Sequence, residues 1–274
     1  MTCAWDSLLR LLPGWMRCQV DCHGKNTLNE LRLRLGKPPE LVLGDKSLWL
    51  DRSVKAEDIS FCVNLASRYS PWAAETMSQG YLTAQGGHRI GICGRAVYIS
   101  GTISTIKEID SLCIRVARDF PGVAKRANVT GSVLILGAPG WGKTTLLRDL
   151  ARLRAQTQTV VAVDERGELF PEGFARGKRM DVLTGARKAE GIDRVLRTMG
   201  PETIAVDEIT AGEDCTALYH VSNCGVSLLA TAHAGSLEEF VKRPLYKPLT
   251  DLNMFDYYLI LHRDKSFTVE RSRF

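Results

Sequence analysis

Residues 132–145 read Ser-Val-Leu-Ile-Leu-Gly-Ala-Pro-Gly-Trp-Gly-Lys-Thr-Thr, and this stretch decides the fold. The apolar run at 132–136 predicts a buried strand, and the glycines after it interrupt the chain before a helix expected at 143–154. The residues from Gly137 to Thr144 fit the pattern G-x-x-x-x-G-K-[ST], in which backbone N–H groups at a helix N-terminus surround phosphate oxygens. Strand, glycine loop and helix in this order predict a P-loop, or Walker A, nucleotide site.

The residues of this loop have different expected tasks. Gly137, Gly140 and Gly142 allow the backbone to approach a phosphate closely. Lys143 is expected to pair with the β- and γ-phosphates of ATP, and Thr144 to bind Mg²⁺ through its hydroxyl. The other loop residues expected to line the nucleotide are Ala138, Pro139, Trp141 and Thr145. The sequence therefore predicts ATP and Mg²⁺ as ligands.

A second motif supplies carboxylates, in the manner of a Walker B strand. The short apolar run at 203–206 ends in two adjacent acids, Asp207 and Glu208. Because ligands of open α/β sheets gather at the carboxyl ends of the strands, these acids are expected beside the phosphate loop. Asp207 would hold Mg²⁺ through a water molecule, and Glu208 would orient and polarise the attacking water. The pair predicts an ATPase that converts ATP and water to ADP and phosphate.

Two more predicted strands end in polar residues. Residues 159–163 run into Asp-Glu-Arg-Gly-Glu, and residues 226–230 run into Thr-Ala-His. We expect Glu165 to assist Mg²⁺ or the attacking water, and Thr231 and His233 to sense the γ-phosphate. For His233 a purely structural hydrogen bond is the alternative. Four strand ends carrying polar groups at one sheet edge indicate a site.

The chain is predicted to form two domains. Short apolar strands alternate with helices, expected also at 190–199 and 213–223, which predicts a parallel sheet covered on both faces. Residues 126–274 are thus an α/β P-loop NTPase domain of the RecA/AAA-like type. Residues 1–125 are predicted to be a smaller α+β domain, because period-2 alternation, a hairpin pattern and glycine-rich runs share it with one helix. Strands are expected there at 31–35, 41–50, 80–83 and 89–99, and the helix at 55–69.

The opening residues 5–16 are apolar-rich and broken by Pro13-Gly14, which predicts a short helix and a turn. This helix would cap the core of the first domain; a docking helix for a partner or membrane surface is the alternative.

Composition sets the class of protein. Among 274 residues, 36 basic and 31 acidic side chains give a net charge of +5, which favours anionic partners without requiring them. Eight cysteines without C-x-x-C spacing predict reduced thiols rather than a zinc or redox motif. The N-terminus lacks a signal-peptide pattern, and no apolar run approaches the roughly 18 residues of a membrane span. We expect a cytoplasmic protein, peripheral at a membrane through partners.

Together these motifs resemble the sporulation stage III AA family, a relative of the type II/IV secretion ATPases. The resemblance lies in residues 30–38, in the glycine–arginine segment 86–95, in the acidic box 164–168, in residues 196–208, and in the histidine box 231–233. Trp141 departs from it, being bulky where the family's loop usually has a small residue. The resemblance implies a homo-oligomeric motor, a hexamer, that energises a membrane-associated secretion channel during sporulation.

Two other functions fit the same motifs. A nucleic-acid-stimulated ATPase is compatible with the positive charge, but aromatic residues make up only 7% of the chain and follow no basic–aromatic stripe, which weakens base stacking. A nucleotide-switched scaffold would bind ATP without turnover, and Glu208 argues against it. Measured turnover, with and without RNA or DNA, separates the three.

Hydrolysis at a P-loop usually needs a cation beyond the loop lysine to offset charge on the phosphoryl oxygens. Within residues 132–274 only Arg166 is plainly tied to a strand end, and it follows its own acidic pair. We therefore expect an arginine of the first domain, Arg89, Arg95 or Arg115, to complete the site of a neighbouring subunit. Ordinary surface charge is the alternative for each of the three.

Overall fold

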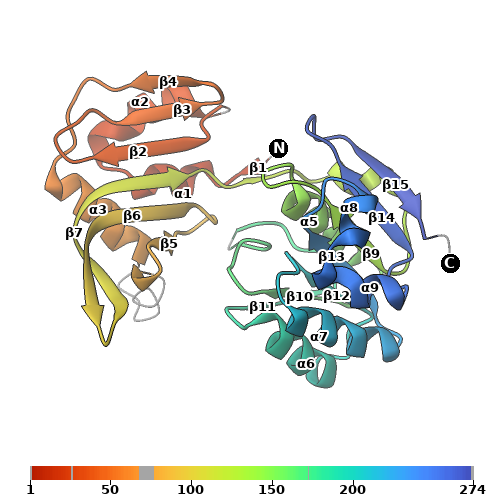
Figure 1. The fold of residues 1–274 in the computed structure, drawn as a ribbon. Helices are drawn as coiled ribbons and strands as arrows, with labels where there is room; N and C mark the ends of the chain where they lie inside the picture. Colours follow the sequence, from red (N-terminus) through yellow and green to blue (C-terminus); the bar gives the residue numbers. More distant parts are fainter. Residues whose placement is uncertain (1, 26, 68–76, 172, 273–274) are drawn as a thin grey trace. The chain divides into compact units, whose positions relative to one another are not determined.

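The computed structural model describes residues 2–25, 27–67, 77–171 and 173–272 (Figure 1). It divides into two compact units. The N-terminal unit comprises Met1–Asp119 with Pro171–Phe174, and the C-terminal unit comprises Phe120–Phe170 with Ala175–Phe274. Within these described ranges, no helix is both long and apolar enough to cross a bilayer.

A seven-stranded sheet forms the C-terminal unit. In spatial order its strands are β11 (Met180–Thr184), β10 (Val160–Asp164), β12 (Thr203–Val206), β13 (Ser227–Ala232), β9 (Val133–Leu136), β14 (Tyr257–Leu261) and β15 (Phe267–Arg271). All neighbours pair in parallel except β14 and β15. The predicted parallel sheet is confirmed, with one antiparallel edge strand as a correction. A tight turn, closed by a 2.9 Å hydrogen bond from the His262 N–H to the Ser266 carbonyl, returns the chain beside β14.

Helices cover both faces of this sheet. They are η1 (Val123–Arg126), α5 (Lys143–Arg154), α6 (Lys188–Thr198), α7 (Gly212–Asn223), α8 (Leu237–Lys242), η2 (Pro244–Tyr246) and α9 (Lys247–Asp251). On β9, Leu134 and Leu136 pack into a cluster with residues of α6, α7, α8 and α9, whereas Val133 and Ile135 pack against α5 and η1. Because successive side chains of a strand point to opposite faces, β9 is buried on both sides, which confirms the predicted layer arrangement.

The N-terminal unit contains a six-stranded antiparallel sheet together with helices, three of which lie entirely within the described residues. Its strands, in spatial order, are β4 (Lys46–Trp49), β3 (Glu40–Leu43), β2 (Glu30–Arg34), β7 (Thr102–Arg115), β6 (Arg89–Ile99) and β5 (Tyr81–Thr83). The helices are α1 (Trp5–Leu11), α2 (Gly14–Gly24) and α3 (Ala56–Ser67), and a short pair joins β1 (Thr2–Cys3) to β8 (Arg118–Asp119). The α+β class is confirmed. The helix predicted at 55–69 is observed as α3. Its last two predicted residues, 68 and 69, lie outside the described residues.

Two elements of this unit differ from the sequence prediction. Where a turn was expected after α1, Pro13 instead precedes a second helix, α2, since its fixed φ of −54° suits a helix start. Trp5, Leu8 and Leu11 of α1 are buried in the unit's core, which favours the core-capping role over a docking helix. The long strand β7 was not predicted, because its isoleucines at 103, 106 and 109 recur at every third residue and break the apolar alternation.

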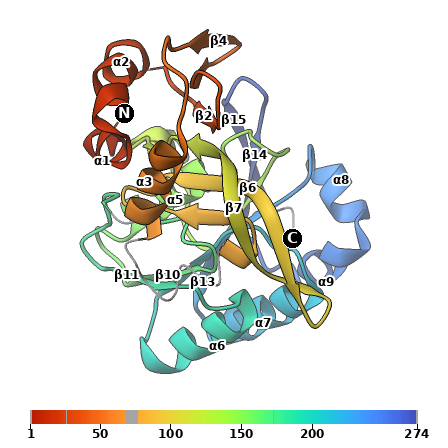
Figure 2. The ribbon, with the colours of Figure 1, turned by 90° about the vertical axis from the view of Figure 1, so that its left-hand side faces the viewer.

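The β6–β7 hairpin continues well beyond the core of its sheet (Figure 2). Its pairing register shifts between Cys93 and Arg95. A Cβ on the intervening Gly94 would lie 2.7 Å from the Lys107 carbonyl oxygen, so only glycine fits where the two strands approach at this bulge. Glycines in the segment that resembles the sporulation family are therefore explained in part by strand packing.

His88, buried at the start of this hairpin, is held as a neutral ring. Its Nδ1 accepts a 3.2 Å hydrogen bond from the Ala117 N–H, and its Nε2 lies 2.9 Å from the Ala4 carbonyl oxygen. Nδ1 must therefore carry no proton. Burial lowers the pKa of His88, and the nearby Arg118 charge lowers it further. The hydrogen bond to Ala4 raises the pKa and offsets part of this decrease.

We expect the N-terminal unit to lose stability in mild acid. Since the folded pKa of His88 lies below the usual value of about 6.5, the unfolded chain takes up a proton first, and stability falls as pH drops through about 6.5. Hydrogen exchange of β6 and β7 amides should accelerate between about pH 7 and about pH 5.5 more than intrinsic chemistry dictates. His88→Gln should remove this dependence, whereas His23→Gln, at an exposed histidine, should keep it. A pH dependence retained by His88→Gln would contradict the assignment.

Candidate active site

The phosphate loop connects β9 to α5, as the sequence predicts. Gly140 and Gly142 have φ angles of 73° and 106°, a left-handed conformation that favours glycine, and Gly142 is the N-cap of α5. Trp141 is half-buried and packs against the hydrophobic cluster beneath the loop. The bulky side chain therefore supports the loop from the core side. Of the other loop residues, Ala138 and Thr145 are half-buried and Pro139 is exposed.

Lys143 is buried at the start of α5 and already has three partners. Its Nζ donates to the Gly137 carbonyl at 2.8 Å and the Ala138 carbonyl at 3.2 Å, and lies 3.0 Å from Nδ1 of His233. Burial lowers the pKa of Lys143, and the carboxylates of Asp207 and Glu208 partly offset that effect. The ammonium thus points into the loop, where a bound phosphate would exchange its carbonyl partners for charged oxygens.

Asp207, which follows β12, connects helix α5 with strand β13. Its Oδ2 accepts a 2.6 Å hydrogen bond from the Thr144 hydroxyl, and its Oδ1 accepts one of 2.6 Å from the Thr231 hydroxyl. Thr231 also accepts a 2.7 Å hydrogen bond from the Glu208 N–H. The pairing of Val206 with Ala230 in parallel strands places these residues side by side. Thr231, expected as a phosphate sensor, lies buried between the two acids, in a position to orient both.

Glu208 holds the most constrained position of the site. Its φ of 54° is rare for a residue with a side chain, and such strain is concentrated at functional sites. One carboxylate oxygen lies 2.7 Å from His233 Nε2, and the other accepts a 3.3 Å hydrogen bond from Arg166 Nη1. Burial alone would raise the pKa of Glu208, but the His233 hydrogen bond and the His233, Arg166 and Lys143 charges hold it below its usual value. The group is therefore ionised near pH 7.

His233 joins the two motifs that the sequence placed far apart. One ring nitrogen faces the lysine of the phosphate loop and the other faces the Glu208 carboxylate. The side chains of Lys143, His233 and Glu208 thus form a continuous polar path from the loop before α5 to the end of β12. Arg166, which sequence analysis set aside as neutralised by its neighbours, pairs with Glu208 instead.

The side chains of the acidic box make more structural contacts than the sequence predicts. Asp164 accepts hydrogen bonds of 2.9 Å from the N–H groups of Glu168, Leu169 and Phe170, which fold the loop after β10. Glu165, expected near Mg²⁺ or water, forms a 2.6 Å ion pair with Lys188. Lys188 was not singled out in the sequence, since a lone lysine at a helix start carries no recognisable signal. Glu165 and Glu208 line the same small hollow of about 30 Å³.

The residues that could hold a magnesium ion are Thr144 and Asp207, whose side-chain oxygens lie 2.6 Å apart. Among the described residues, no group of three or more His, Cys, Asp or Glu side chains is placed to hold a metal. Mg²⁺ commonly keeps several waters and takes one or two protein ligands together with substrate phosphates. Thr144 and Asp207 match this preference for few protein ligands. A magnesium ion bound to them would neutralise negative charge on the phosphates of a bound nucleotide.

The three arginines predicted as fingers all lie on the N-terminal sheet and have partners. The Arg89 guanidinium lies 4.3 Å from the Tyr81 ring centre. Arg95 pairs with Glu108 at 2.7 Å, and Arg115 with Glu30 at 3.5 Å.

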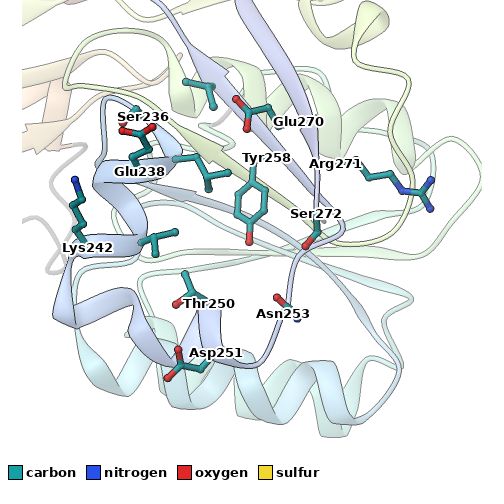
Figure 3. Close-up of a pocket in the computed structure, with 13 residues that line it drawn as sticks. Ser236, Glu238, Lys242, Thr250, Asp251, Asn253, Tyr258, Glu270, Arg271 and Ser272 are labelled. Carbon is teal, nitrogen blue, oxygen red and sulfur yellow. The ribbon is translucent and has the colours of Figure 1, made fainter. Parts of the chain in front are cut away.

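A larger hollow of the C-terminal unit lies elsewhere (Figure 3). It measures about 770 Å³ and lies among α8, α9, β14 and β15, with Tyr258 at its centre. None of the phosphate-loop residues or the paired acids lines it. Cavity size therefore does not identify the reactive site here, whereas the convergence of charged side chains does.

Known protein sequences resemble this chain over most of its length. The family model described as sporulation stage III, protein AA, matches residues 7–270. The chain is 37% identical over 258 residues to stage III sporulation protein AA of Bacillus subtilis (strain 168), covering 87% of this chain and 83% of that protein. It is also 27% identical over 251 residues to protein SEEDLING PLASTID DEVELOPMENT 1 of Arabidopsis thaliana, covering 87% of this chain but 35% of that protein.

Solved structures share the fold. The Legionella pneumophila ATPase DotB superposes with a TM-score of 0.61 at 19% identity, covering 96% of this chain and 80% of that chain. The pilus retraction motor PilT with bound ADP gives a TM-score of 0.57 at 12% identity, covering 89% and 76%. These likenesses confirm the fold, which the chain shares with the ATPase DotB and the pilus retraction motor PilT. Since its family model spans nearly the whole chain, this protein belongs to the sporulation stage III, protein AA, family.

Proposed function

We propose that this chain is an ATPase that binds ATP with Mg²⁺ at the phosphate loop and hydrolyses the γ-phosphate. The observation that carries the proposal is His233, whose ring lies between Lys143 of the loop and Glu208 after the acidic strand. A site built only to bind nucleotide has no need of an ionised acid connected in this way to the phosphate lysine.

Each residue then has a chemical task. Lys143 binds phosphate oxygens, and Thr144 with Asp207 holds the metal. Glu208 accepts the proton of the attacking water, while Thr231 and His233 fix the positions of the two acids. The strained backbone of Glu208 keeps its carboxylate aimed into the site rather than along the sheet.

We further propose that the protein works as a homo-oligomer, a hexamer, that turns hydrolysis into motion of a membrane-associated complex during sporulation. Membership of the sporulation family and a fold shared with an ATPase and a pilus motor support this role. Contact with the membrane would be peripheral and made through partners.

The binding step is tested by Lys143→Ala. Deleting the Lys143 ammonium, which points into the loop, should weaken ATP affinity about ten- to a hundredfold, the scale of a charged hydrogen-bonded contact. Isothermal titration with the non-hydrolysable analogue of Mg·ATP measures it. Lys178→Ala, at an exposed lysine of the same unit, is the matched control and should bind normally. Unchanged affinity in a folded Lys143→Ala protein would exclude this loop as the nucleotide site.

A further inference from the structure

A turn at the C-terminal end of the sheet lies against the phosphate loop. Strand β9 has β13 on one side and β14 on the other, with Leu136 paired to both Ala232 and Ile260. The chain leaving β14 therefore lies beside the chain leaving β9. A Cβ on Gly137 would approach the Leu261 Cβ to 3.1 Å, so the loop and the start of the turn touch directly.

This turn is internally fixed. The Lys265 N–H donates to the His262 carbonyl at 3.0 Å, and the Asp264 carboxylate accepts from the Ser266 N–H at 3.0 Å and from its hydroxyl at 2.6 Å. Lys265 has a φ of 70°, the left-handed backbone conformation of a tight turn. The turn thus presents the Lys265 side chain in one direction.

That direction is toward the crest of the phosphate loop. Lys265 Nζ donates a hydrogen bond to the Gly140 carbonyl. A Cβ built on Gly140 would meet no described atom within 4 Å, so packing does not fix the crest there. The lysine is accordingly a tether between the turn and the most open residue of the loop.

The tether lies on the side opposite the reactive acids. Asp207, Glu208 and His233 follow β12 and β13, whereas Lys265 follows β14 across the phosphate loop. If the γ-phosphate is at the acids, the nucleoside end of a linear nucleotide extends away from them. A group on the β14 side then acts on the nucleoside and the α- and β-phosphates, which ATP and ADP share. It does not act on the γ-phosphate, which only ATP has.

We infer that Lys265 is a nucleotide-positioning residue, which holds the Gly140 carbonyl so that the loop N–H groups are arranged for phosphate before the nucleotide arrives. The inference rests on the proposed ATPase function. Preorganisation of this kind contributes equally to the ground state and the transition state, so it changes affinity and KM but not kcat.

The test replaces Lys265 by methionine, which keeps the length of the side chain and removes the ammonium. Lys265→Met should weaken Mg·ADP and Mg·ATP binding by the same factor, about tenfold, with kcat within about twofold of the parent. Arg263→Met, in the same turn and equally exposed, is the control and should leave all three values unchanged. Titration calorimetry with ADP gives a readout that does not depend on turnover.

Two results would overturn the inference alone. If the parent protein binds ADP and a folded Lys265→Met protein binds it equally well, the tether has no role in binding. If ADP binding is kept but kcat collapses, Lys265 acts on the γ-phosphate instead. A parent protein that binds neither ADP nor ATP would refute the proposed function itself, and the inference with it.

Discussion

Glu208→Gln is expected to leave ATP binding intact and to slow hydrolysis at least about a hundredfold, the scale of losing a positioned general base. Glutamine keeps the size of the side chain and an oxygen that His233 can contact, but it cannot accept a proton from water. Single-turnover phosphate release from a preformed Mg·ATP complex measures the step directly, because it separates chemistry from binding and product release.

The matched control for this prediction is Glu165→Gln. Glu165 lines the same small hollow but forms a 2.6 Å ion pair with Lys188, so its carboxylate is already engaged in structure. We expect it to lose much less activity than Glu208→Gln. Near-normal turnover in Glu208→Gln together with a large loss in Glu165→Gln would exchange the roles of the two acids.

Much of this site was predictable because each part follows a local rule. A phosphate loop needs glycines before Lys143, and the acids after the strand at 203–206 stand at the sheet edge that collects ligands. The contacts between these parts were not predictable. That Thr231 lies between the acids and does not face solvent depends on the register of β12 against β13, which no single segment encodes.

The C-terminal strands show a second limit of sequence reasoning. The run Tyr257–Leu261 followed by alternation at 267–271 is a hairpin pattern, but it is short and its turn lacks glycine. The contact from Lys265 to Gly140 was out of reach, since the two residues are far apart in sequence and meet only because β14 pairs with β9. The contact places a cation of the C-terminal unit beside the phosphate loop, on the side away from the paired acids.

An arginine supplied by a neighbouring subunit remains our prediction for the charge on the transferred phosphoryl group. At least one of Arg89→Ala, Arg95→Ala and Arg115→Ala should bind ATP normally and lose hydrolysis by a factor of roughly 10³. Arg95 and Arg115 are about two-thirds exposed, at 66% and 65%, and their ion pairs lie at the surface. Exposed pairs of this kind are weak, so either side chain can leave its partner for a phosphate at little cost.

The decisive experiment mixes subunits. A finger variant lacks the arginine but keeps an intact phosphate loop, whereas Lys143→Ala protein lacks the loop lysine but keeps the arginines. Each is expected to be inactive alone. Mixed oligomers should regain part of the activity, because one subunit supplies the loop and its neighbour the arginine. Arg10→Ala, at an exposed arginine of the same unit, is the control and should be active without mixing. A monomer that is fully active at high dilution, or mixed oligomers without regained activity, would show that the site is complete within one chain. In that case Arg166, which pairs with Glu208, is the next cation to test for a role in hydrolysis.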